Sequence, residues 1–131
     1  MEAEIFFTDT PIVRPPQTRA LRETGAVVEF HGVVRATEGD AQLSGLFYEA
    51  YEPMARREFA RILTELDARH APQAVCIVHR LGFVPVGEAS LYVRVEAKHR
   101  GAALAFCGTL IDQMKQEVPI WKIVRRNSTA I

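Results

Sequence analysis

The sequence predicts one α+β domain over residues 1–131, with a mostly antiparallel sheet and two long helices. Two long segments carry apolar side chains at helical spacing, and six shorter segments are rich in β-branched and aromatic residues. Their order places pairs of strands between helices, which is typical of an α+β domain. The length of 131 residues and the hydrophobic fraction of 48% suit a single globular domain.

The charge balance and the apolar runs exclude several classes of function. Sixteen basic residues balance sixteen acidic ones, whereas a general nucleic-acid-binding protein carries a basic excess. No apolar run approaches the ~20 residues that span a bilayer. The first residues are acidic and lack the basic and apolar regions of a secretory signal. We therefore expect a cytoplasmic protein that binds neither nucleic acid nor membrane.

The N-terminal half is predicted to form a strand, a short helix and two further strands, at residues 3–8, 17–23, 26–35 and 43–51. Gly25 follows the short helix, where a glycine commonly ends a helix in the left-handed conformation. A polar loop over residues 36–42 joins the last two strands. Because this loop has the composition of a hairpin connection, we expect the strands on either side of it to pair antiparallel.

The C-terminal half is predicted to contain a helix, two strands, a second helix and a last strand, at residues 53–70, 74–81, 89–97, 100–116 and 118–124. Pro53 suits the first position of a helix, where its missing N–H is not needed. The two central strands are expected to form a hairpin, and the second of them has one apolar and one polar face. The second helix is apolar nearly all round, which predicts burial on several sides and a position near a subunit interface.

Lysine is rare in this chain, and its few copies are close together in the sequence. Thirteen of the sixteen basic residues are Arg, and the three lysines are Lys98, Lys115 and Lys122. An ammonium group can lose a proton and act as an acid, a base or a nucleophile, whereas a guanidinium cannot. Catalytic lysines are one interpretation of this pattern, and chance clustering of surface lysines is the other.

A second group of cations lies where a strand is expected to lead into the second long helix. Lys98, His99 and Arg100 precede Gly101 there, and a helix N-terminus adds free N–H groups that attract a phosphate or carboxylate. A solvated junction is the alternative. Arg100 and Lys115 are fifteen residues apart on one helix, or roughly 22 Å. They serve separate sites or meet across a twofold axis, and we favour a C2 dimer with composite pockets.

The other candidate side chains give weaker signals. His31 fits a structural histidine better than a functional one, and His79 gives no recognisable signal. Arg35 ends a strand, where it either contacts an anion or lies on the surface. Cys76 and Cys107 lie in apolar runs and are predicted to be buried and reduced. No CxxC or HxxxH pair is present, so a structural zinc site is not expected. We predict neither a bound metal nor a cofactor.

Four segments of the chain together resemble one protein family. They read GAVVEFHGVVR, LFYEAYEPMA, VHRLGFVPVGEASLYVRVEAKHRGAAL and MKQEVPIWKIV, and they extend over about residues 25–124. Their ordered motifs are FxGxVR, YEAYxxMA, HRxGxxxxGE, a small residue before xHR, and two lysines separated by six residues, with PxWK around the second. This set resembles the large, catalytic subunit of molybdopterin synthase.

The resemblance implies an α/β-hammerhead fold and a homodimer of large subunits, each of which binds a small ubiquitin-like sulfur-carrier subunit to give a heterotetramer. The carrier's C-terminal Gly-Gly tail enters the pocket as a thiocarboxylate. The enzyme transfers two sulfur atoms to cyclic pyranopterin monophosphate, opens the cyclic phosphate and produces the dithiolene of molybdopterin. The activity that the resemblance implies is therefore a sulfurtransferase of molybdenum cofactor biosynthesis.

The resemblance also implies roles for individual residues. Lys115 and Lys122 match the family's catalytic lysines, and a lysine can stabilise an oxyanion and protonate a leaving group. His99 and Arg100 match a pterin-binding pair, and Arg35 matches the arginine that ends FxGxVR. Contacts with substrate are expected at Val33, Val34, Arg35, His99, Arg100, Lys115, Lys122, Ile123 and Val124.

The chain departs from the family pattern at three places. Val33 occupies a position that is often basic in the family, and residues 36–42 lack the usual Asn-His start. Lys122 is followed by Ile-Val-Arg-Arg, where the family commonly has another charged residue and a longer tail. If that tail closes the pocket or grips the carrier, this function is either reduced here or supplied by Arg125 and Arg126.

Two other functions compete with sulfur transfer. A non-catalytic dimeric module would hold the carrier protein or a phosphorylated ligand without performing chemistry. The pair Lys115 and Lys122 favours the enzyme, because binding alone could use Arg. A local RNA-binding domain is disfavoured by the zero net charge and by the lack of aromatic pairs suited to stacking on a strand.

Overall fold

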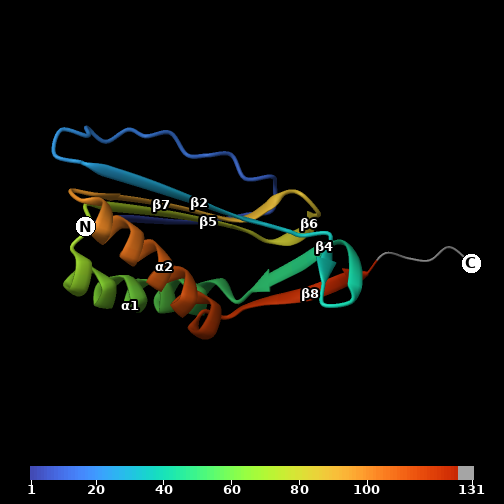
Figure 1. Ribbon diagram of the computed structural model, residues 1–131. Helices are drawn as coiled ribbons and strands as arrows, with labels where there is room; N and C mark the ends of the chain where they lie inside the picture. Colours follow the sequence, from blue (N-terminus) through green and yellow to red (C-terminus); the bar gives the residue numbers. More distant parts are fainter. Residues whose placement is uncertain (127–131) are drawn as a thin grey trace, which may run out of the picture.

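The computed structural model describes residues 1–126, which form two sheets and two helices (Figure 1). The helices cover one face of a four-stranded sheet, an extended N-terminal segment crosses its other face, and a smaller sheet continues from one end (Figure 1). The elements are β1 (Glu2–Thr8), β2 (Ala26–Val33), β3 (Thr37–Glu38), β4 (Ala41–Ala50), α1 (Glu52–His70), β5 (Ala74–Arg80), β6 (Gly82–Pro85), β7 (Ala89–Ala97), α2 (Arg100–Glu117) and β8 (Ile120–Arg126).

The strand pairing confirms the predicted fold class. The larger sheet has the order β1-β5-β7-β2 and is antiparallel except for the pair β1–β5. The predicted hairpin of β5 and β7 is confirmed, although β6 lies within its connection and pairs with β4. In the smaller sheet β4 pairs with β3, β6 and β8. The described chain is therefore α+β, with a mostly antiparallel sheet arrangement and two long helices.

Helix α1 is amphipathic, as its sequence predicts. Its buried side chains recur at three- and four-residue intervals, and Phe59 is fully buried against α2 and the larger sheet. Pro53 lies in the first turn, where it costs no hydrogen bond. Arg61 lies on the exposed side and forms ion pairs with Glu58 and Glu65. The helix therefore covers the core with one side and meets solvent with the other.

Helix α2 buries its apolar residues mainly within its own chain. Six of them pack against α1, β2 and β7, namely Ala103, Phe106, Cys107, Leu110, Ile111 and Met114. Leu104 remains 58% exposed. The apolar pattern of α2 is thus largely explained without a second subunit. Cys76 and Cys107 are both buried and unpaired, as predicted, and no helix within residues 1–126 is long and apolar enough to cross a membrane.

The predicted short helix over residues 17–23 is wrong. Residues 9–25 contain no helix and cross the outer face of the larger sheet (Figure 1). A helix advances only ~1.5 Å per residue, so a helical segment would cover much less of this face. The extended segment also satisfies buried polar groups of β7: the Pro15 carbonyl accepts a hydrogen bond from Arg94 at 2.6 Å, and two side chains of the segment contact Glu96.

This segment also changes the environment of β7. The sequence predicts one buried and one polar face, but Arg94 and Glu96 on the polar face are only 4% and 3% exposed. Both faces of the strand are therefore buried, one under the helices and the other under residues 9–25.

Gly25 does not end a helix in the left-handed conformation. Its N–H donates a hydrogen bond to the Ala97 carbonyl at 3.0 Å, next to the start of β2. A Cβ atom at Gly25 would lie 2.1 Å from the carbonyl oxygen of Lys98. Glycine is required here because two backbones approach each other closely.

The predicted pairing of the strands on either side of residues 36–42 is also wrong. β2 pairs with β7, whereas β4 belongs to the smaller sheet. Residues 36–42 contain β3, which turns back onto the start of β4 through Gly39 in the left-handed conformation. The chain leaves the larger sheet before this turn, between Val33 at the end of β2 and Thr37 at the start of β3, so β2 and β4 belong to different sheets.

Candidate active site

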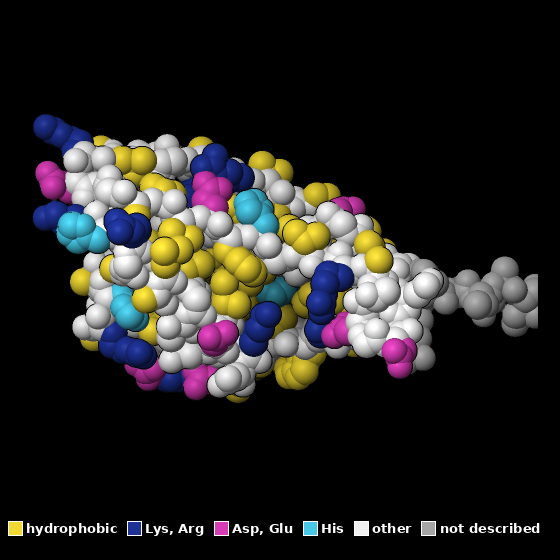
Figure 2. Space-filling model, viewed as in Figure 1, with side chains coloured by type: hydrophobic (Ala, Val, Ile, Leu, Met, Phe, Trp, Pro, Cys, Tyr) yellow, Lys and Arg dark blue, Asp and Glu magenta, His cyan; other side chains and the backbone are white. Residues whose placement is uncertain are grey.

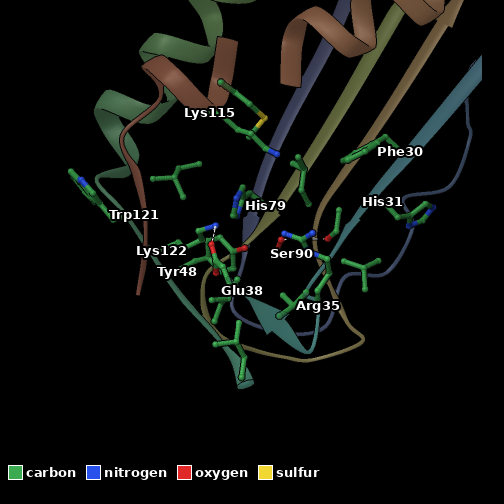
Figure 3. A pocket seen from close by; sticks show the side chains of 18 of the residues that line it. Phe30, His31, Arg35, Glu38, Tyr48, His79, Ser90, Lys115, Trp121 and Lys122 are labelled. Atoms are coloured by element: carbon green, nitrogen blue, oxygen red, sulfur yellow. Dashed lines mark hydrogen bonds and ion pairs between the residues drawn. The ribbon is translucent and has the colours of Figure 1, made fainter. Parts of the chain in front are cut away.

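A cavity of about 670 Å³ lies where the larger sheet, the C-terminal end of α2 and the smaller sheet meet (Figure 3). Three of its lining side chains, Arg35, Lys115 and Lys122, are positively charged, and one, Glu38, is negatively charged. Figure 2 shows basic side chains on both sides of a recess, with a histidine visible deeper inside. The cavity is therefore predominantly cationic, and it is assembled from segments far apart in the sequence.

Lys115 extends into the cavity from the last turn of α2 (Figure 3). The helix ends two residues later, where the Val118 N–H still bonds to the Met114 carbonyl, and Pro119 prevents a further turn. Within residues 1–126 the Lys115 ammonium has no hydrogen-bond or ion-pair partner. Its charge is therefore available to a ligand.

Lys122 reaches the same cavity from β8, in the smaller sheet. It lies opposite Tyr48 of β4, and its Nζ atom is 2.8 Å from Oε1 of Glu38 on β3. The chain leaves α2 and enters β8 within three residues, so Lys115 and Lys122 lie on different elements and line one cavity (Figure 3).

The end of β2 brings Val33, Val34 and Arg35 to the cavity. A bulge at Val33 ends the regular pairing with β7. The Val34 N–H donates to the Glu88 carbonyl at 3.0 Å, and its own carbonyl accepts from the Gly87 N–H at 2.9 Å. The backbone of Val34 is thus already satisfied and holds the strand end in place. Arg35 follows as an exposed cation without an ion-pair partner among the described residues.

His99 and Arg100 do not line this cavity. They lie at the opposite end of α2, and fifteen residues of helix between Arg100 and Lys115 correspond to roughly 22 Å. Both are exposed. One chain alone therefore does not bring the expected pterin-binding pair to the lysines.

Ile123 and Val124 follow Lys122 along β8 and are also absent from the cavity lining. They are 49% and 41% exposed. The expected part of Arg125 and Arg126 in closing the pocket concerns side chains that lie outside what the structure describes.

His79 is a cavity residue that the sequence reasoning missed. It is 5% exposed, its ring meets the Tyr48 ring edge-on at 5.2 Å, and Figure 3 shows it between Lys115 and Lys122. Its Nδ1 lies 2.8 Å from the Arg80 carbonyl, which can only accept, so Nδ1 carries the proton. Burial lowers the pKa of His79 below its usual value, although the bond to Arg80 opposes this. The imidazole is therefore neutral at pH 7.

The available signal for His79 was the motif HRxGxxxxGE itself. The other residues of this motif stabilise the connection between β5 and β7. Arg80, which is nearly buried, forms an ion pair of 2.7 Å with Glu88, and Gly82 and Gly87 both adopt positive φ angles. The motif thus fixes the backbone that carries His79 and that binds the end of β2.

The fold and the cavity define a class of protein: an α+β protein in which two sheets and one helix end surround a predominantly cationic cavity. The chain belongs to the MoaE protein family, whose model matches residues 8–117. The matched range includes Arg35 and Lys115 and ends before Lys122.

A similar protein from rice supports the membership in this family. The chain is 45% identical over 98 residues to the molybdopterin synthase catalytic subunit of Oryza sativa subsp. indica. The aligned region covers 75% of this chain and 51% of the rice protein. The chain thus spans about half the length of the rice protein.

Two solved structures share the fold. The molybdopterin synthase from Staphylococcus aureus matches with a TM-score of 0.83 at 30% identity, over 95% of this chain and 92% of that one. A protein–protein complex of subunits 1 and 2 of molybdopterin-converting factor from Helicobacter pylori 26695 contains a chain with a TM-score of 0.70 at 23% identity, over 97% and 86% of the two chains.

Proposed function

We propose that this chain is the catalytic subunit of a molybdopterin synthase, which transfers sulfur from a thiocarboxylated carrier protein to cyclic pyranopterin monophosphate. One observation carries the proposal: Lys115 and Lys122 line one cavity together with Arg35. Membership of the MoaE family and the identity to the rice catalytic subunit support it.

The three cations suit a reaction between two anions. The substrate brings a cyclic phosphate and the carrier brings a thiocarboxylate, and cations between them reduce their repulsion. Negative charge develops on oxygen during acyl transfer, and an ammonium group can stabilise it and donate a proton to a leaving group. Arg35 can bind a phosphate but cannot supply a proton at neutral pH. We therefore assign the chemistry to Lys115 and Lys122 and anion binding to Arg35.

The cavity also offers surfaces for the two reactants. Phe30 and Trp121 present aromatic rings suited to a pterin. A Gly-Gly tail has no side chains, so it can enter a narrow opening and bind through its backbone in an extended conformation. We propose that a small ubiquitin-like carrier inserts its tail in this way, and the Helicobacter pylori complex of two subunits is compatible with such a partner.

We further propose a C2 homodimer in which a second copy supplies His99 and Arg100. Within one chain these residues lie far from the cavity, and free N–H groups at the start of α2 add to their attraction for a phosphate. The exposed apolar side chains of Phe83, Ile123 and Val124, on β6 and β8, offer a surface for contact between subunits.

Reconstitution tests the proposed activity. The purified chain is mixed with a thiocarboxylated carrier and cyclic pyranopterin monophosphate, and the dithiolene product is measured after oxidation to its fluorescent form. We expect product only when the chain, the thiocarboxylated carrier and cyclic pyranopterin monophosphate are all present. A stable complex with the carrier that forms no product would contradict the enzyme and favour the non-catalytic binding module.

Subunit mixing tests the composite site. We expect Lys115→Ala and Arg100→Ala to be inactive separately, and their mixture to regain part of the activity, because a heterodimer keeps one intact cavity. A mixture as inactive as its components, with subunit exchange verified by mass spectrometry, would contradict the composite site.

A further inference from the structure

Glu38 is the one carboxylate among the described residues that line the cavity. Three cations, Arg35, Lys115 and Lys122, line the same cavity, and Glu38 pairs with only one of them. Its Oε1 atom is 2.8 Å from Nζ of Lys122, whereas Arg35 and Lys115 have no ion-pair partner within residues 1–126. The cavity therefore holds two unpaired cations and one that already has a counter-ion (Figure 3).

The backbone places Glu38 independently of Lys122. Glu38 pairs with Ala41 across the β3–β4 turn, and Gly39 takes the left-handed conformation that this turn requires. The Leu43 N–H closes the base of the turn by donating to the Ala36 carbonyl at 2.8 Å. A hydrogen-bonded hairpin thus presents the carboxylate to the cavity.

The ion pair is accessible to solvent, so it can be displaced. The side chains of Lys122 and Glu38 are 47% and 34% exposed. Pairs of this kind contribute little to stability, because water screens the charges and ordering two long side chains costs entropy. A phosphate group or a thiocarboxylate that approaches Lys122 competes with a carboxylate that is already in place.

We propose that Glu38 is a resident counter-ion of Lys122, and that an anionic substrate group must displace it to bind. Glu38 thereby determines which ligands bind at Lys122, since a weakly charged ligand does not displace it. Arg35 and Lys115 remain available to an anion. The inference deepens the proposed function and rests on it only for the identity of the natural anion.

The test measures anion binding without turnover. Trp121, the chain's one tryptophan, lines the cavity next to Lys122, so its fluorescence can report an anion there. The full chain is titrated with inorganic pyrophosphate near 0.15 M ionic strength, and calorimetry with the same probe provides a second readout. Glu38→Gln should bind pyrophosphate about two- to fivefold more tightly, the range expected from losing a partly exposed pair.

Asp40→Asn is the matched control. Asp40 lies on the same hairpin turn but is exposed, does not line the cavity and is not paired with Lys122. It removes the same charge, and we expect a smaller change, below about 1.5-fold, because solvent screens charges over ~8 Å at this ionic strength. In a Lys122→Gln background, Glu38→Gln should no longer tighten binding, since its effect passes through Lys122.

Three results would overturn the proposal. They are unchanged or undetectable pyrophosphate binding after Glu38→Gln, equal gains from Glu38→Gln and Asp40→Asn, and a gain from Glu38→Gln that persists in the Lys122→Gln background. None of these measurements involves sulfur transfer. Absence of dithiolene product with the expected binding pattern would therefore contradict the proposed function and leave the role of Glu38 standing.

Discussion

Lys115 and Lys122 line one cavity although Lys115 belongs to helix α2 and Lys122 to strand β8 of the smaller sheet. Their chemical settings differ. Lys122 is paired with Glu38 at 2.8 Å, whereas Lys115 has no charged partner within the described chain. The two ammonium groups are therefore not equivalent, and substitutions at the two positions are expected to have different consequences.

Lys115→Ala should abolish sulfur transfer and leave the fold intact. The side chain is exposed and unpaired, so its removal should change the free energy of unfolding by less than about 0.5 kcal/mol. Activity and urea unfolding are measured on the same preparation. Arg57→Ala, which removes an exposed cation from α1, is the control and should be active. Near-normal turnover in Lys115→Ala would remove this lysine from the mechanism.

Lys122→Arg separates charge from proton transfer. Arginine keeps the positive charge beside Glu38 but does not release a proton at neutral pH. If Lys122 acts as a general acid, the rate should fall by about 10²-fold or more. Single-turnover rates of this variant and of Lys122→Gln give the comparison. Activity within tenfold of the wild type, together with an inactive Lys122→Gln, would assign a purely electrostatic role.

Gly25→Ala should destabilise the protein strongly. The new Cβ atom would lie 2.1 Å from the Lys98 carbonyl oxygen, a backbone atom that cannot move independently. Overpacking of this kind costs about 1–3 kcal/mol or more. Gly101→Ala is the control, because its Cβ meets open space in the first turn of α2 and should be neutral or slightly stabilising. Equal unfolding midpoints for the two variants would contradict the close approach.

His79 should make the protein less stable as the pH falls. Burial lowers the pKa of His79, so the unfolded chain takes up a proton near pH 6.5 while the folded chain stays neutral to lower pH. Between these two pKa values the unfolded state binds more protons. The contribution to stability is therefore complete above about pH 6.5 and declines as the pH falls toward the folded pKa.

Urea unfolding between pH 5 and pH 8 measures this dependence. His79→Gln should flatten it, because glutamine does not titrate. Identical pH profiles for the wild type and His79→Gln would show that the histidine is not buried as described.

Glu96→Ala should loosen the N-terminal segment. Glu96 is buried beneath it and contacts Arg19 at 3.1 Å, so its removal leaves partly buried cations without their counter-charge. Loss of one partner of a buried pair costs about 3 kcal/mol. Limited proteolysis should cut residues 9–25 faster than in the wild type. Glu65→Ala, which breaks an exposed pair with Arg61, should leave both stability and cleavage nearly unchanged.

The parts of the fold that the sequence predicted correctly depend on local periodicity. Phe59 and its neighbours recur at helical spacing, and β5 and β7 are joined by a glycine-containing connection, so α1 and the β5–β7 pair were predictable. The short helix over 17–23 was wrong because Arg94 and Glu96, which are distant in sequence, hold that segment extended. The predicted β2–β4 pairing was wrong for a similar reason, since β2 pairs with β7 and β4 pairs with β8, both of which are distant in sequence.

The sequence likewise indicated some residues of the candidate site and not others. Lys115 and Lys122 stood out by the rarity of lysine and by the resemblance to a family, and the structure brings both to the cavity. His79 and Glu38 carried no individual signal. Their places in the cavity depend on tertiary contacts, of His79 with the Tyr48 ring and of Glu38 with Lys122, which join residues far apart in the sequence.

A sulfur-tracing experiment shows whether this cavity transfers sulfur from the carrier to the substrate. A carrier whose thiocarboxylate contains the heavy isotope ³⁴S is mixed with cyclic pyranopterin monophosphate and either the wild-type chain or Lys115→Ala, and the product is analysed by mass spectrometry. We expect both dithiolene sulfurs to carry the label with the wild type, and we expect Lys115→Ala to bind the carrier but to yield no labelled product. Unlabelled product from the wild type, or labelled product formed equally fast by Lys115→Ala, would contradict sulfur transfer in this cavity.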